Sequence, residues 1–376
     1  MVTALFQPLQ VRATTLKSRV VMSAMTRRFS PGGIPGPDVA AYYRRRAEND
    51  VGLVLTEGVG VDDPAALDDP GIPVMYGEAA LAGWRRVVEQ VHDAGGIIFP
   101  QLWHQGVLRD TRISVDPEFP NRSPSGLFGP IGQTSLSAEF IHHASAPIPT
   151  LTEEEVTDLV AAFARSAEHA VAAGFDGIAL HGGHGYLIDS FLWAGTNHRT
   201  DRYGGDHVGR ARFTVELVKA IRAVVGPDRP ILLRFSQHKQ QDYLARLADT
   251  PAELGEILGP IADAGVDIFD ASTRRFWVPA FEGSDLNLAG WAKKLTGKIA
   301  MTVGSVGLAA SLEESFVSGT AETADNIPAV MERFNRGEFD LVGVARAILA
   351  DPAWAKRLRS GEPAKPFEKG MLGRLD

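Results

Sequence analysis

About eight short apolar runs alternate with helical patterns, and this alternation constrains the fold more than any other feature. The apolar runs lie at residues 19–25, 52–56, 96–101, 176–180, 230–235, 266–270, 298–303 and 339–344. Helical patterns lie at residues 38–49, 79–92, 152–171, 211–224, 252–264, 324–335 and 352–359. The alternation predicts a parallel sheet closed into a (β/α)8 TIM barrel. An open doubly wound sheet is the competitor, but it calls for Gly-x-Gly-x-x-Gly after the first strand, and that motif is absent.

The composition fits one enzyme domain without a disulfide or metal–thiolate framework. The 376 residues suit a single decorated barrel and show no shift in composition, so one domain is expected over residues 1–376. A net charge of −8 disfavours a nucleic-acid partner, and the absence of cysteine excludes disulfides, zinc–thiolate sites and iron–sulfur clusters. We find neither a signal peptide nor a run long enough to cross a bilayer, so a soluble cytoplasmic protein without a membrane partner is expected.

The strand at 176–180 opens into a glycine-rich turn that carries His181, His184 and Tyr186, and an apolar helical run follows. In a barrel enzyme the chemistry lies at the carboxyl ends of the strands. Two imidazoles and one phenol are therefore expected to face one active site. Taken alone, the two histidines could instead bind a metal, with only Asp189 as a nearby third ligand. Tyr186 could likewise be plain packing at a helix start.

The ends of the last two strands suit a phosphate group. Gly304 and Ser305 follow the seventh strand, and Arg346 follows the eighth. The loops after these strands are the usual phosphate site of this fold, and an arginine fork bonds two phosphate oxygens at once. The alternative for Arg346 is a surface ion pair with Asp351.

Other strand ends suit a flat heteroaromatic ring. Thr26, Gln101 and Arg234 could bond the edge of such a ring, and Gly58 would let it lie against the backbone. A ring, a ribityl-like tail and one phosphate together describe flavin mononucleotide (FMN). After the third strand, residues from about 105 to 150 are rich in Pro, Ser and Gly, and a segment this long predicts a lid.

Several motifs together resemble the Old Yellow Enzymes, the FMN-dependent ene-reductases. The most specific is His-x-x-His-Gly-Tyr-Leu-Ile-Asp from His181, with Asn-His-Arg-Thr-Asp-Arg-Tyr-Gly-Gly downstream at 197–205. Further matching segments lie at residues 5–9, 19–27, 56–58, 101–104, 210–213, 233–236, 303–304 and 346–352. The resemblance thus spans nearly the whole chain and implies an FMN-binding barrel that is reduced by NADH or NADPH.

The resemblance also implies a role for each matching residue. His181 and His184 would bind the carbonyl oxygen of the substrate, and Tyr186 would supply a proton. Trp103 would wall the substrate pocket. The cofactor would contact Ala24, Met25, Thr26 and Gly58, then Gln101 and Arg234 at its pyrimidine side, and Gly304, Ser305, Ala345 and Arg346 at its phosphate. The expected reaction is reduction of the activated C=C bond of an α,β-unsaturated carbonyl compound, a small molecule, by a monomer or homodimer.

Some positions depart from the family pattern. Ala24 stands where proline is common, Ser190 replaces a usual glutamine, and Ala345 stands where glycine usually precedes the arginine. The N–H of Ala345 can reach a phosphate if its φ is negative. The segment from Phe276 to Trp291 looks closer to relatives that act on N-methylated amino acids or other small cyclic substrates. An FMN-dependent oxidative demethylase of a small N-methylated amino acid is therefore an alternative function.

Two further alternatives lie outside this chemistry. A non-redox barrel lyase or aldolase would need a lysine at a strand end, and no strand end offers one. A non-catalytic protein that binds FMN or another phosphate ligand would follow if Tyr186 had no role. The larger relatives with an added flavin domain and an iron–sulfur cluster are excluded by the length and by the absence of cysteine.

Overall fold

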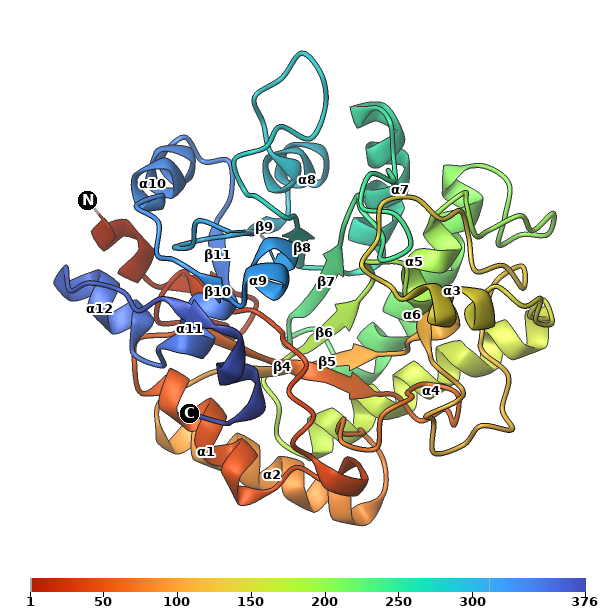
Figure 1. Ribbon diagram of the computed structural model, residues 1–376, viewed down its shortest axis with the longest axis horizontal. Coiled ribbons are helices and arrows are strands. Elements are labelled where there is room, and N and C mark those ends of the chain that lie inside the picture. The colour runs from red at the N-terminus through yellow and green to blue at the C-terminus, as the bar shows by residue number, and fades with distance from the viewer. Residues whose placement is uncertain (1, 311) are drawn as a thin grey trace.

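A computed structural model describes residues 2–310 and 312–376, and eight parallel strands in it close into a barrel (Figure 1). Around the barrel the strands follow the order β11-β3-β4-β5-β6-β7-β8-β9. Their bounds are Val20–Met22 (β3), Leu53–Gly60 (β4), Ile98–Trp103 (β5), Ile178–His181 (β6), Ile231–Phe235 (β7), Ile268–Ser272 (β8), Ile299–Val303 (β9) and Leu341–Val344 (β11). The predicted (β/α)8 barrel is confirmed, whereas its reading as a single domain stays a prediction.

Helices surround the barrel, and each long helix buries one apolar face. They are α1 (Pro37–Ala47), α2 (Glu78–Asp93), α4 (Glu153–Ala172), α6 (His207–Val225), α7 (Pro251–Ala264), α8 (Leu288–Thr296), α10 (Ile327–Asn335) and α12 (Trp354–Ser360). Shorter helices lie in the connections: α3 (Ala138–Ala144), α5 (Leu187–Leu192), α9 (Leu312–Ser318) and α11 (Arg346–Ala350). In α4 the predicted capping box is present, since Thr152 and Glu155 bond each other's backbone N–H, and Leu159 and Phe163 are buried.

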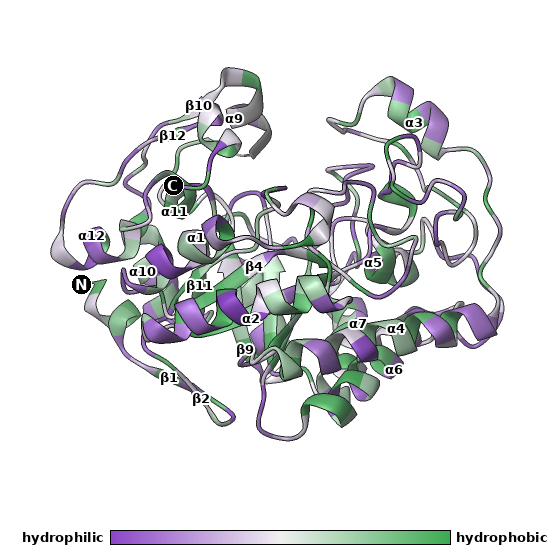
Figure 2. Ribbon diagram, turned by 90° about the horizontal axis from the view of Figure 1, so that it is seen from below, coloured by the Kyte–Doolittle hydropathy of each residue, from purple (hydrophilic) through white to green (hydrophobic). Residues whose placement is uncertain are grey.

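The amino-terminal end of the barrel is filled by a small hairpin. Strands β1 (Leu9–Val11) and β2 (Thr14–Leu16) pair antiparallel, and Val11 and Leu16 join the buried side chains inside the barrel. Figure 2 shows this hairpin on the side of the molecule opposite α3 and α9, and it shows apolar residues along β4 and β11. Because the hairpin fills this end, a ligand is left with the carboxyl ends of the strands.

Several predicted boundaries are wrong by a few residues. Asp38 lies in the first turn of α1 and is not its N-cap, which is Gly36, because Pro37 takes the first helical position. Helix α6 begins at His207 rather than Ala211, since the side chain of Asp206 accepts the N–H of Gly209. The short helix α8 was not predicted, and β4 ends at Gly60 instead of the predicted residue 56.

The segment after β5 is mostly irregular and rests on the loop after β7. It holds a 3-10 turn, η3 (Gly106–Leu108), and α3. Thr134 donates to the carbonyl oxygen of Gln240 at 2.5 Å, and the N–H of Tyr243 donates to that of Gln133 at 2.7 Å. That this segment acts as a lid stays a prediction.

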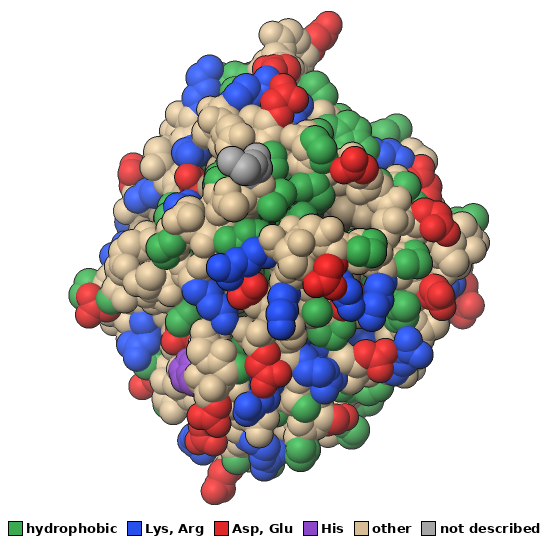
Figure 3. Space-filling view, turned by 90° about the vertical axis from the view of Figure 1, so that its left-hand side faces the viewer, with side chains coloured by type: hydrophobic (Ala, Val, Ile, Leu, Met, Phe, Trp, Pro, Cys, Tyr) green, Lys and Arg blue, Asp and Glu red, His purple; other side chains and the backbone are tan. Residues whose placement is uncertain are grey.

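On the face of the molecule drawn in Figure 3, basic and acidic side chains are interspersed, and neither kind dominates.

No helix of the described residues is long and apolar enough to span a bilayer. The strands β10 (Thr320–Ala321) and β12 (Phe367–Glu368) form a second small sheet outside the barrel, which the sequence analysis did not predict. The cytoplasmic location and the monomer or homodimer remain predictions.

Candidate active site

One cavity at the carboxyl ends of the barrel strands brings the predicted site residues together. Its volume is about 970 Å³, large enough for two small molecules in contact. The predicted residues that line it are Ala24, Met25, Thr26, Gly58, Gln101, Trp103, His181, His184, Tyr186, Arg234, Gly304, Ser305, Ala345 and Arg346. Every predicted site residue therefore reaches the same space, although the sequence separates the first from the last by most of the chain.

Four rings form a cluster on one wall of this cavity. The His181 imidazole stacks on the Trp103 indole with ring centroids 5.9 Å apart. The Tyr186 ring meets His181 edge-on at 4.8 Å and Trp103 at 4.9 Å. The His184 ring meets His181 edge-on at 5.0 Å. The two imidazoles and the phenol are thus neighbours, as the sequence motif predicted.

The loop after β6 holds these rings in an unusual backbone conformation. His184 has φ 64° and Gly185 has φ 84°, so two consecutive residues are left-handed. The N–H of His184 donates to the Ser236 hydroxyl at 2.9 Å, and its Nε2 lies 2.9 Å from the Ser272 hydroxyl. Tyr186 is the N-cap residue of α5. The start of α5 therefore places the phenol, while Ser236 after β7 and Ser272 at the end of β8 hold His184.

Burial keeps the reactive side chains uncharged near neutral pH. Burial lowers the pKa of the His181 imidazole well below its ordinary value, and Arg234 lowers it further. Burial likewise lowers the pKa of His184, with smaller effects of His238 and His181. Burial raises the pKa of the Tyr186 phenol above its ordinary value, and Asp68 adds to this. Two neutral imidazoles can donate N–H bonds, and the phenol keeps its proton.

The polar end of the cavity holds an arginine that is fixed by two partners. Arg234 Nε donates to Asp270 at 2.6 Å, and its Nη2 donates to the Ser23 hydroxyl at 2.5 Å. Gln101 on β5 is also buried and lines the same cavity, and among the residues that the structure describes its amide nitrogen has no hydrogen-bond partner. A buried donor without a partner is costly, so Gln101 is suited to a ligand acceptor.

Gly58 makes a contact with Trp103 in addition to the cofactor contact expected of it. A Cβ at this position would lie 2.3 Å from Cε3 of Trp103. The glycine therefore makes room for the indole that stacks on His181, in addition to lining the cavity. Thr26 is exposed toward the cavity, as expected for a residue at a strand end.

The predicted phosphate end is built from β9 and β11. Gly304 has φ 149°, and a Cβ there would meet the carbonyl oxygen of Thr273 at 2.7 Å, so glycine is required. Ala345 has a negative φ of −105°. This is the condition under which its N–H can reach a phosphate. Arg346 donates to the carbonyl oxygen of Ala310 at 2.9 Å and to the Ser315 hydroxyl.

The alternative pairing of Arg346 with Asp351 is wrong. Asp351 instead pairs with Arg357 at 2.8 Å and lies 4.0 Å from Lys365. Arg346 turns toward the loop after β9 and lines the cavity.

The metal alternative loses its third ligand. Asp189 is fully buried and paired with Lys239 at 2.7 Å. Over the part of the chain that the structure describes, no group of three or more His, Asp or Glu side chains is placed to hold a metal ion.

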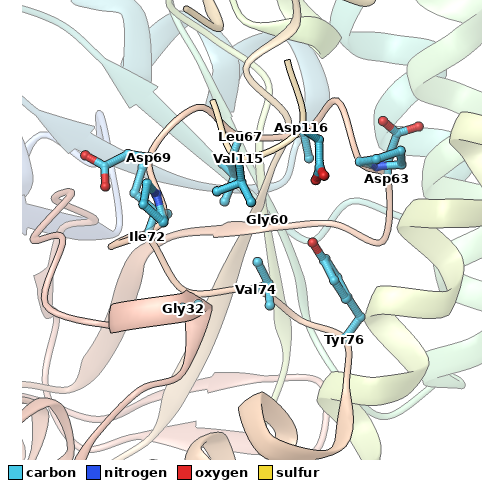
Figure 4. Close-up of a pocket in the computed structure, with 14 residues that line it drawn as sticks. Gly32, Gly60, Asp63, Leu67, Asp69, Ile72, Val74, Tyr76, Val115 and Asp116 are labelled. Atoms are coloured by element: carbon cyan, nitrogen blue, oxygen red, sulfur yellow. The ribbon is translucent and has the colours of Figure 1, made fainter. Parts of the chain in front are cut away.

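A second pocket of about 200 Å³ lies beside the 60–76 segment (Figure 4). Asp63, Asp69 and Asp116 line it, together with Tyr76. Asp69 is paired with Arg28 at 3.1 Å, and Asp63 lies 3.5 Å from Arg122. Because Asp63 and Asp69 already have cationic partners, and because none of the predicted site residues lines this pocket, it is not the candidate site.

The sequence analysis missed several residues that line the main cavity. They include Ser272 at the end of β8, Thr273 and Arg274 directly after it, and His238, Gln240 and Tyr243 in the loop after β7. Arg274 stacks on the Tyr243 ring at 3.6 Å, and the His238 ring lies 5.0 Å from His184. The end of β8 obeys the same strand-end rule as the others, so Ser272 could have been found. His238 and Tyr243 lie within an irregular loop and carry no such signal.

A closed barrel with a cavity at the carboxyl ends of its strands, lined by two imidazoles, a phenol and two arginines, is typical of barrel enzymes. The model of the NADH:flavin oxidoreductase / NADH oxidase family matches residues 4–365. The chain belongs to this family, and its resemblance to the Old Yellow Enzymes is confirmed.

Similar proteins include one curated reductase and two solved structures. 12-Oxophytodienoate reductase 7 of Oryza sativa is 38% identical over 260 residues, which cover 67% of this chain and 62% of that protein. The chain thus spans less than two thirds of the length of this relative. Morphinone reductase in complex with tetrahydroNAD is 26% identical, with a TM-score of 0.81 and coverage of 99% and 96%. An Old Yellow Enzyme from Pichia is 25% identical, with a TM-score of 0.79 and coverage of 98% and 90%.

Proposed function

We propose that this chain is an FMN-dependent NAD(P)H oxidoreductase that reduces the activated C=C bond of α,β-unsaturated carbonyl compounds. The observation that carries the proposal is the cluster of His181, His184 and Tyr186 in one cavity. Burial, which lowers the pKa of both imidazoles and raises the pKa of the phenol, supports it. The family match and the similarity to 12-oxophytodienoate reductase 7 and to morphinone reductase support it.

The residues at the polar end of the cavity fit FMN. Gln101 offers a buried amide N–H that has no partner among the described residues, and Arg234 offers a guanidinium that Asp270 and Ser23 hold in place. Gly304, Ser305, Ala345 and Arg346 form the end suited to the phosphate. Bound there, FMN would supply hydride transfer, with NADH or NADPH as the reductant.

The chain's own residues supply polarisation and a proton. His181 and His184 would donate N–H bonds to the substrate carbonyl oxygen, which makes the β-carbon electrophilic and stabilises the enolate that develops. Tyr186 would protonate the α-carbon. Trp103 holds both His181 and Tyr186 by ring contacts and would wall the substrate.

The geometry of the cavity gives little support to the two alternative functions, the oxidative demethylase and the lyase. No residue of the segment 276–291 lines the cavity, so its difference from the enone reductases does not reach the substrate directly. No lysine lines the cavity either, and Lys239 is engaged by Asp189, which disfavours a lyase that works through an amine.

The test begins with the colour of the purified protein. We expect a yellow protein that releases FMN, not FAD, on heating, and NADPH or NADH should bleach it in the absence of oxygen. Cyclohexenone should then restore the colour. If enones leave the reduced protein unchanged while an N-methylproline-like amine bleaches the oxidised protein, the demethylase takes the place of the ene-reductase. A colourless protein that takes up no FMN would contradict both.

A further inference from the structure

A buried ion pair lies directly behind the catalytic loop. Asp189 on α5 and Lys239 in the loop after β7 are both fully buried, and Oδ1 of Asp189 lies 2.7 Å from the Lys239 ammonium. Neither residue lines the cavity. A buried ion pair gains little stability over well-packed apolar side chains of the same size, so its position calls for another explanation.

The second oxygen of Asp189 reaches the backbone between two site residues. Oδ2 accepts the N–H of Gly185 at 2.6 Å, and Gly185 joins His184 to Tyr186. A Cβ at Gly185 would lie 2.1 Å from Oε1 of Gln241, so this peptide is also confined by packing. The N–H of Gly185 is therefore held by a charged acceptor, which forms stronger hydrogen bonds than a neutral one.

The loop after β7 holds the same peptide from its other side. Ser236 accepts the N–H of His184 at 2.9 Å, and the N–H of Gln240 donates to the carbonyl oxygen of His184 at 3.1 Å. The Lys239 ammonium also donates to the carbonyl oxygen of Ser236 at 3.3 Å. The left-handed conformation of His184 is unfavourable for a residue with a side chain, and it persists only where its surroundings determine it.

We propose that Asp189, held by Lys239, is a positioning residue that sets the places of His184 and Tyr186 through the N–H of Gly185. The inference rests on the proposed function, because it assigns Tyr186 to proton delivery. Asp189 fixes the peptide, Lys239 fixes Asp189 to the loop after β7, and Ser236 fixes the adjoining N–H. A shift of this peptide would displace the phenol and one imidazole together, while the polar end of the cavity stays in place.

The experiment compares two double variants of similar size. Asp189→Asn with Lys239→Gln keeps a polar pair and an oxygen that accepts the Gly185 N–H. Asp189→Leu with Lys239→Met keeps the packing but removes the acceptor. With FMN bound, we expect both to be reduced by NADPH within threefold of the wild-type rate. Reoxidation by cyclohexenone should slow at least tenfold in the Leu/Met variant and less than threefold in the Asn/Gln variant.

Hydrogen exchange of the Gly185 amide gives a readout that does not depend on turnover. It should be at least tenfold faster in the Leu/Met variant than in the Asn/Gln variant. Equal exchange rates, or equal effects of both variants on enone reoxidation, would overturn the proposal. If wild type reduces no enone, the proposed function fails, but the exchange comparison still decides the positioning.

A smaller change covers the case in which the Leu/Met variant does not fold. Ser236→Ala removes the acceptor of the adjoining His184 N–H and leaves the ion pair intact. We expect it to slow enone reoxidation at least threefold with flavin reduction by NADPH unchanged. Unchanged reoxidation, or both half-reactions slowed alike, would overturn the proposal.

Discussion

Tyr186 is the residue whose proposed role is easiest to separate from packing. Tyr186→Phe removes one oxygen and keeps the ring contacts with Trp103 and His181, so fold and FMN binding should survive. Flavin reduction by NAD(P)H should be nearly unchanged, while reoxidation by an enone should slow by about 10²–10⁴-fold, the usual contribution of one general acid. Rapid mixing measures both. Nitroalkenes, whose anion needs no immediate proton, are the control and should slow less.

Equal slowing of both half-reactions would make Tyr186 structural. If neither slows, another group delivers the proton.

Gln101 offers a residue-scale test of the cofactor site. Its amide nitrogen is buried and has no partner in the described part of the chain, so Gln101→Leu should leave the apoprotein as stable as wild type or more so. The same change should weaken FMN binding by about 1–3 kcal/mol, because a flavin oxygen loses its donor. Fluorescence titration of apoprotein with FMN gives the dissociation constant, and thermal unfolding gives the stability. A destabilised apoprotein with unchanged FMN affinity would show that Gln101 serves the fold and not the cofactor.

At the scale of elements, the strand-end rule predicted most of the site from the sequence. It worked because a barrel brings all carboxyl ends of its strands to one face, whatever their separation in the chain. It missed Ser272 because the end of β8 was passed over. It had no means of finding the pairing of Asp189 with Lys239, since the contact joins a helix to an irregular loop and follows no local period. Helix boundaries failed where a cap, such as Asp206, lay outside the apolar pattern.

The contact between the segment after β5 and the loop after β7 yields an element-scale prediction. Tyr243 takes part in this contact. Its hydroxyl is hydrogen-bonded to Ser135, and the guanidinium of Arg274 stacks on its ring at 3.6 Å. Tyr243→Phe keeps the ring and removes the hydroxyl, so global stability should fall by about 1 kcal/mol or less. Amide exchange in residues 132–136 should rise, and KM for the enone should increase more than kcat changes. Tyr243→Leu, which also removes the stacking surface, should enlarge both effects; unchanged exchange in both would contradict a lid held by Tyr243.

At the scale of the whole molecule, buried neutral imidazoles tie stability to pH. Burial, with Arg274 and Lys239 adding to it, lowers the pKa of His238 to about 3. In the unfolded chain the His238 imidazole has its ordinary pKa of about 6.5. Between about pH 6.5 and pH 3 the imidazole is therefore protonated in the unfolded state and neutral in the folded state. The contribution of His238 to the free energy of unfolding is therefore fully present above pH 6.5 and is lost as the pH falls toward 3. Glu57 acts in the opposite direction, since burial raises its pKa to about 7, so the total pH dependence does not isolate His238.

The comparison of wild type with His238→Gln does isolate it. One such imidazole lowers the free energy of unfolding by up to about 1.4 kcal/mol for each pH unit below 6.5. Glutamine is neutral at every pH, so the variant does not show this decrease. Between pH 6.5 and 5.0 the free energy of unfolding of wild type should therefore fall by up to about 2 kcal/mol more than that of the variant; the partial exposure of the ring makes this an upper bound. Urea unfolding at fixed ionic strength, with FMN at the same saturating concentration, measures it. Parallel pH profiles would mean that His238 titrates normally in the folded protein and is charged beside His184 at mildly acidic pH.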